Sequence, residues 1–140
     1  MSENEDLEVK KLIDKMLKEL ISKRAKAKTS LEKAMMRLTD ENFEKALKEN
    51  DVIVVDFWAE WCMPCRFYEP IFEKVARKFG GKAIFARLNV DESPLTAGRL
   101  GISAIPTTII FVKGKPVKRI VGLVDEQMLT KAVKDVLGNL

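Results

Sequence analysis

The apolar positions of this 140-residue chain follow one pattern before residue 38 and another after it. In residues 1–37 they recur every three or four positions with charged residues between them, and this spacing predicts an amphipathic helix. The stripe is made of Val9, Leu12, Ile13, Met16, Leu17, Leu20 and Ile21. We therefore predict an N-terminal helical extension, residues 1–37, followed by a single domain, residues 38–140.

From residue 38 onward, short apolar runs alternate with segments of helical pattern. The apolar runs predict strands at residues 52–58, 83–90, 107–112 and 116–121. Capping residues, prolines and glycines predict helices at residues 39–48, 64–79, 93–101 and 126–137. Strands that are first separated by helices and then joined by the turn Lys113-Gly114-Lys115 imply an α/β fold, a mixed central sheet with helices on both faces.

The two parts also differ in charge. Lys and Arg outnumber Asp and Glu by ten to seven in residues 1–37, but only by 15 to 14 in the remaining 103 residues. The basic excess follows Ile21, at Lys23, Arg24, Lys26 and Lys28. Such an extension is either a solvated helix that folds back on the domain or frays, or a segment that contacts an unknown partner, nucleic acid or an anionic surface. It contains no aromatic residue for base stacking, which argues against nucleic acid.

The residues with the clearest chemistry are Trp61-Cys62-Met63-Pro64-Cys65, which hold the only two cysteines and follow closely on a predicted strand. Two thiols three residues apart at the first turn of a helix lie on one face and can close into a small disulfide. The dipole and free N–H groups of the helix N-terminus lower the pKa of the leading thiol. Cys62 would then attack a disulfide on another molecule, and Cys65 would resolve the mixed disulfide.

Other chemistry is limited by what the chain lacks. It has no histidine, which removes Cys–His and Ser–His–Asp catalysis and histidine metal sites. Cys62 and Cys65 could form a zinc knuckle only between subunits, because four-ligand zinc needs two further Cys or His ligands. There is no GxGxxG motif, so electrons must come from a partner, and we expect neither a cofactor nor a metal.

Its sequence also gives an expectation for location. The acidic N-terminus has no hydrophobic segment behind a basic start, so no secretory signal is expected, and no apolar run reaches the ~20 residues of a membrane span. We therefore expect a cytoplasmic protein. In a reducing compartment, a CxxC disulfide is transient and catalytic rather than structural.

At this point the residues resemble those of the thioredoxin family over about residues 38–140. The matching segments are Asp56-Phe57-Trp58-Ala59-Glu60-Trp61-Cys62-Met63-Pro64-Cys65, Pro70, Asn89-Val90-Asp91, Gly101-Ile102-Ser103-Ala104-Ile105-Pro106-Thr107 and Gly122. The resemblance implies a thioredoxin-like fold, reduction of protein disulfides, and recycling by thioredoxin reductase or an equivalent electron donor. Two features depart from the family pattern: Met63 replaces the usual glycine, and the extension is not part of the basic fold.

The resemblance also implies roles for residues near the cysteines. Asp56 matches a buried acid that assists proton transfer at the inner cysteine; from the sequence alone, the alternative is a strand-end aspartate that reaches water or a backbone amide. Met63 and Pro64 lie between the thiols, and Met63, which lacks the backbone freedom of glycine, would shift the reduction potential.

A substrate surface is implied as well. Ile105-Pro106 would be a cis peptide against the disulfide, and because proline offers no N–H, a neighbouring backbone edge stays free for an extended substrate. Gly122 would allow close approach, or would simply end a strand. Trp61 is the expected surface contact and Trp58 the expected packing residue, although either could be plain core.

Three rival functions stay open on the sequence. The protein could be an oxidant or isomerase, which differs from a reductase in its reduction potential. It could be a binding module that uses the surface of Trp61, Pro106 and Gly122 for a fixed partner. The extension could instead carry the main role, as a tether to a complex.

Overall fold

The computed structural model describes residues 8–21 and 35–140, which belong to separate units, Met1–Lys33 and Ala34–Leu140. Residues 8–21 form one helix, which confirms the helix predicted from the apolar stripe. The basic residues Lys23, Arg24, Lys26 and Lys28 lie outside the described residues.

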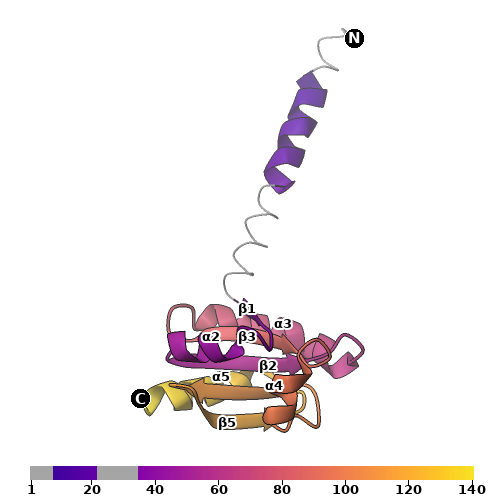
Figure 1. Ribbon diagram of the computed structural model, residues 1–140. Coiled ribbons are helices and arrows are strands. Elements are labelled where there is room, and N and C mark those ends of the chain that lie inside the picture. Colours follow the sequence, from indigo (N-terminus) through magenta and orange to yellow (C-terminus); the bar gives the residue numbers. More distant parts are fainter. Residues whose placement is uncertain (1–7, 22–34) are drawn as a thin grey trace. The chain divides into compact units, whose positions relative to one another are not determined.

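The second unit is built on a five-stranded sheet (Figure 1). The strands are β1 (Met35–Leu38), β2 (Val52–Trp58), β3 (Ile84–Asn89), β4 (Thr107–Val112) and β5 (Lys115–Val121). Their order across the sheet is β1-β3-β2-β4-β5; β1, β3 and β2 are parallel, and β4 and β5 are antiparallel to their neighbours. The predicted mixed sheet is thereby confirmed.

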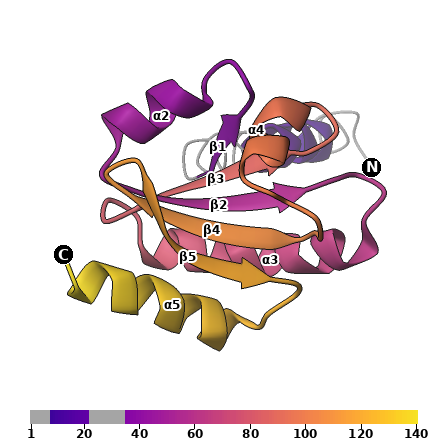
Figure 2. The same ribbon diagram turned by 60° about the horizontal axis from the view of Figure 1, so that its bottom comes forward.

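Four helices cover this sheet on two sides. They are α2 (Phe43–Glu49), α3 (Met63–Lys78), α4 (Pro94–Arg99) and α5 (Glu126–Gly138). Figure 2 shows α3 and α5 on one face of the sheet and α2 and α4 on the other. Each face therefore has its own apolar core between sheet and helices.

The start of the domain differs from the prediction. The sequence placed it at residue 38, whereas β1 begins at Met35 and pairs with β3 along its whole length. Of the four residues of β1, Leu38 alone is fully buried, because the strand lies at the edge of the sheet. So short a strand, without alternation of apolar and polar positions, leaves no signal in the sequence.

The central strand β2 decides where the functional residues lie. Its alternate side chains enter opposite cores: Val54 packs on the α3 side, and Val55 packs on the α2 side. Asp56 follows Val54 by two residues, so it points to the α3 side. The chain then passes from the end of β2 through Ala59–Trp61 directly into α3, which brings both cysteines to this end of the sheet.

Candidate active site

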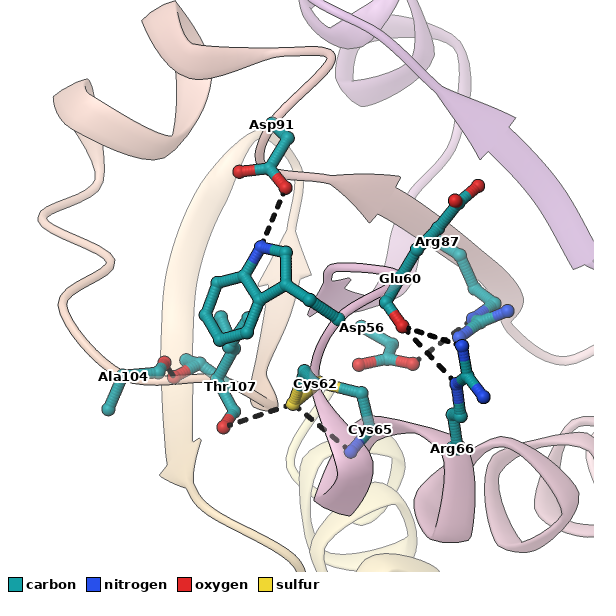
Figure 3. The surroundings of a disulfide bond; sticks show 11 residues. Asp56, Glu60, Cys62, Cys65, Arg66, Arg87, Asp91, Ala104 and Thr107 are labelled. Carbon is teal, nitrogen blue, oxygen red and sulfur yellow. Dashed lines mark hydrogen bonds and ion pairs between the residues drawn. A yellow bond between two sulfur atoms is a disulfide. The ribbon is translucent and has the colours of Figure 1, made fainter.

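Cys62 and Cys65 form a disulfide at the start of α3, with their Cα atoms 5.3 Å apart (Figure 3). Cys62 is the N-cap residue, and its Sγ accepts a hydrogen bond from the Cys65 backbone N–H at 3.2 Å. Pro64 lies in the first turn, where its missing N–H costs no helical hydrogen bond. After reduction, the same N–H and the positive end of the helix would favour a thiolate on Cys62.

The two cysteines differ in exposure. Cys62 keeps 4% of its surface exposed, whereas Cys65 is completely buried. Large exposed apolar side chains lie close to Cys62 in the sequence: Trp61 is 71% exposed, Met63 61% and Phe67 64%. The sequence interpretation missed Phe67, although it lies four residues after Met63 and so on the same side of the helix. A partner that reaches Cys62 would therefore meet exposed apolar side chains on the neighbouring residues.

The loop before β4 supplies the opposite side of the site. The Ile105-Pro106 peptide is cis, and the carbonyl oxygen of Ile105 lies 3.7 Å from the Sγ of Cys62. Pro106 is buried, and its carbonyl accepts the Gly122 N–H at 2.8 Å. Gly122 has a φ of 94°, which favours glycine. The structure thus brings together Cys62, Pro106 and Gly122, which lie far apart in the sequence.

Asp56 is completely buried beneath this site. Its Oδ2 accepts a hydrogen bond from Arg87 Nε at 3.1 Å, and its Oδ1 has no partner among the described residues. Burial raises the pKa of Asp56 to about 6, against the opposing effect of the Arg87 charge. Figure 3 shows the carboxyl group joined to Arg87, in the same part of the site as Cys65. A buried carboxyl with one unpaired oxygen is equipped to take up a proton.

Arg87 was not anticipated from the sequence. It lies opposite Asp56 in the register of β2 and β3, and its guanidinium carbon lies 4.2 Å from the centre of the Trp58 ring. Its Nη1 also pairs with Glu69 at 3.2 Å. Trp58 is half-buried and packs against a cation. The pairing could not be found beforehand because it depends on strand register.

Two further contacts fix the loop between β2 and α3. The Trp61 Nε1–H donates to Asp91 Oδ2 at 2.8 Å, which holds the exposed indole in place. Arg66 donates to the Glu60 carbonyl from Nε and Nη2, at 3.2 and 3.0 Å. The loop that precedes Cys62 is therefore held by hydrogen bonds from Trp61 to Asp91 and from Arg66 to Glu60 (Figure 3).

A dithiol pair that caps a helix, beside a buried carboxyl and a cis-proline loop on a mixed sheet, defines a thiol-disulfide oxidoreductase.

Among residues 8–21 and 35–140, no helix has the length and apolar character needed to cross a membrane.

Comparisons with known proteins agree with this class. The family model described as Thioredoxin matches residues 34–135. The chain is 44% identical over 104 residues to a thioredoxin of Alicyclobacillus acidocaldarius, covering 74% of this chain and 99% of the relative. It is 46% identical over 101 residues to Thioredoxin 2 of Chlorobaculum tepidum, covering 71% and 93%. A solved structure of a mutant thioredoxin from Halobacterium salinarum superposes with a TM-score of 0.67 at 31% identity, over 72% of this chain and 88% of that one.

The chain belongs to the thioredoxin family. Its redox-active dithiol is Cys62 with Cys65, and it acts as a thiol-disulfide oxidoreductase that reduces protein disulfides. The matched region begins at residue 34, so most of the predicted extension lies outside the family domain.

Proposed function

We propose that Cys62 attacks the substrate disulfide and that Cys65 resolves the mixed disulfide, with Asp56 as proton acceptor. Cys62 thiolate displaces one substrate thiolate and forms a mixed disulfide. Cys65 then gives its proton to Asp56 and attacks the Sγ of Cys62, which releases the second substrate thiolate and closes the 62–65 disulfide. Two electrons pass from the dithiol to the substrate. The contact that supports this order is the Cys65 N–H on the Cys62 Sγ, at the more exposed end of the pair.

The substrate surface in this proposal consists of Trp61, Ile105, Pro106 and Gly122. Trp61 supplies exposed apolar area, and the Ile105 carbonyl lies beside the attacking sulfur. Met63 and Pro64 tune the reduction potential, and Trp58 supports the site from below through its contact with Arg87. An extended segment that contains the target cysteine would lie across the loop before β4.

The disulfide is returned to a dithiol by thioredoxin reductase or an equivalent electron donor in the cytoplasm, with no bound cofactor of its own. Family membership supports this part of the proposal. The extension, residues 1–37, stays available for an unknown partner, and nucleic acid is disfavoured because these residues lack aromatic side chains.

A redox titration tests the direction of the reaction. The full chain is equilibrated with glutathione buffers, and the fraction of 62–65 disulfide is measured after acid quenching and alkylation. A reductase is expected near the potential typical of thioredoxins, about −270 mV, whereas a potential of about −180 mV or higher would indicate an isomerase or an oxidant. The Cys65→Ser variant serves as control because it should trap the mixed disulfide without releasing the product.

A further inference from the structure

A row of polar side chains crosses the sheet on the face that α3 covers. Arg87 of β3, Asp56 of β2 and Thr108 of β4 occupy directly opposed positions in the strand register. Two residues further along the strands, the same face carries Phe85, Val54 and Ile110, all within the apolar core. A polar row beside so apolar a core is costly unless its groups are paired.

Two consecutive residues of α3 meet this row at its two sides. The Tyr68 hydroxyl and the Thr108 Oγ1 are 2.7 Å apart, and Glu69 Oε1 lies 3.2 Å from Arg87 Nη1. Tyr68 is fully buried, and the Glu69 side chain is 44% exposed. Arg87 is thus held from three directions, by Asp56, by Glu69 and by the Trp58 ring, with 14% of its side chain exposed.

We propose that Glu69 is a positioning residue of the exchange reaction, which holds Arg87 between α3 and the sheet and thereby sets the pH range over which Asp56 accepts the proton of Cys65. This inference rests on the proposed role of Asp56. Its basis is the geometry of one guanidinium that pairs with two carboxylates through different nitrogens and stacks on an aromatic face.

The charges around Asp56 give the direction of the effect. Arg87 from β3 favours the ionised carboxylate, whereas Glu69 from α3 disfavours it. From the other packed elements come Thr108, which is neutral, the Tyr68 hydroxyl, whose pKa burial raises, and the thiol of Cys65 itself. Because of Glu69, the guanidinium of Arg87 is shared between two carboxylates and does not pair with Asp56 alone. Without Glu69, the cation would hold Asp56 ionised to lower pH.

The test removes the charge of Glu69 while keeping its shape. In the reduced full chain, the Asp56 carboxyl is titrated by ¹³C NMR in the parent, in Glu69→Gln and in Glu73→Gln. Glu73→Gln removes the same charge one turn further along α3, where the side chain is also partly exposed. We expect Glu69→Gln to move the Asp56 titration to lower pH by at least about half a unit, roughly a threefold loss of proton affinity, and to exceed Glu73→Gln clearly. Equal shifts in the two variants, or an upward shift in Glu69→Gln, would overturn the proposal.

A second pair of variants tests whether the effect passes through Arg87. In an Arg87→Gln background, adding Glu69→Gln should shift the Asp56 titration by less than half as much as it does in the parent. An undiminished shift would mean that Glu69 acts by its own charge and does not position Arg87. Should Arg87→Gln fail to fold, Arg87→Lys takes its place, because an ammonium group lacks the second fixed nitrogen needed to bridge both carboxylates.

The kinetic readout separates this inference from the proposed function. The rate of mixed-disulfide resolution is measured in single turnover from pH 4.5 to 8. In Glu69→Gln, the fall of this rate at acid pH should occur at a lower pH than in the parent, by the same amount as the shift in the NMR titration of Asp56. If Asp56→Asn leaves this rate unchanged, Asp56 is not the proton acceptor, and the proposed function fails. If Asp56→Asn slows resolution but Glu69→Gln moves neither the titration nor the fall of the rate at acid pH, only the role of Glu69 fails.

Discussion

Replacing the buried Asp56 by Asn should stabilise the fold and slow the reaction at the same time. Asn keeps the shape of the carboxyl and can still accept the hydrogen bond from Arg87, but it carries no charge. The charge is what burial penalises, because Asp56 is completely inaccessible and one of its oxygens has no partner among the described residues. Asn therefore mimics the protonated acid.

The size of the gain follows from the pKa of Asp56, which burial raises from the ordinary value of 3.8 to about 6 in the folded protein. Each pH unit between the two values is worth about 1.4 kcal/mol, so a fully ionised Asp56 costs the fold about 3 kcal/mol. Below pH 3.8 the acid is protonated in both the folded and the unfolded state, and no penalty exists. The penalty grows as pH rises from 3.8 to about 6 and is constant above that.

Denaturant unfolding of the oxidised protein at pH 3.5 and pH 8 measures this effect. We expect Asp56→Asn to raise the free energy of unfolding by about 3 kcal/mol at pH 8 and to leave it nearly unchanged at pH 3.5. The control is Asp51→Asn, which removes an exposed carboxylate just before the same strand and should stay within about 0.5 kcal/mol at both pH values.

Turnover is measured on the same proteins. Resolution of the mixed disulfide should slow by at least about tenfold in Asp56→Asn, because an amide cannot take the proton of Cys65. A gain in stability that is equal at both pH values would refute the assignment to a buried charge. An unchanged turnover rate would refute the role of Asp56 as base.

Three further predictions concern other parts of the chain. After reduction, an alkylating reagent should modify Cys62 before Cys65, because Cys62 is the more exposed; equal labelling on peptide mapping would contradict the assignment of roles. Deleting residues 1–33 should leave insulin reduction largely intact; a fragment 34–140 that folds but loses most activity would show that the extension builds part of the site. Deletion through residue 38 also removes β1, and it should lower the free energy of unfolding by about 2–3 kcal/mol. Gly122→Ala should destabilise the fold by about 1–2 kcal/mol because of its φ of 94° alone, since an added Cβ meets no atom within 4 Å. The control Gly98→Ala, inside α4, should be neutral or stabilising, and a neutral Gly122→Ala would show that the backbone there relaxes.

The parts of the fold that the sequence predicted best are those in which several local signals coincide. The apolar run of β2 and the turn into Cys62 combine strand propensity, burial on both faces and a proline in the first helical turn, so β2 was predicted with the bounds that it has. The edge strand β1 was missed because only Leu38 is fully buried and the other three residues carry no pattern.

The site was predictable only where its residues are close in sequence or belong to a family motif. Cys62 and Cys65 share one helical turn, and the cis peptide before Pro106 was expected from the resemblance. The pairing of Arg87 with Asp56 and Glu69 was not, because it depends on the relative register of β2 and β3 and on the rotation of α3 about its axis. Local periodicity determines neither quantity.

The hydrogen bond from the Cys65 N–H to the Cys62 Sγ couples helix α3 to the redox state of the protein. The atom that caps the helix is also the atom that reacts, so the cap changes character within each catalytic cycle. A thiolate accepts the N–H more strongly than a neutral disulfide sulfur does, because hydrogen bonds to charged acceptors are the stronger ones. The hydrogen bond at the first turn of α3 is therefore strongest when the protein carries its two electrons, whereas the covalent 62–65 disulfide closes the same turn once it has delivered them. Hydrogen exchange at the Cys65 amide would report this change from one restraint to the other.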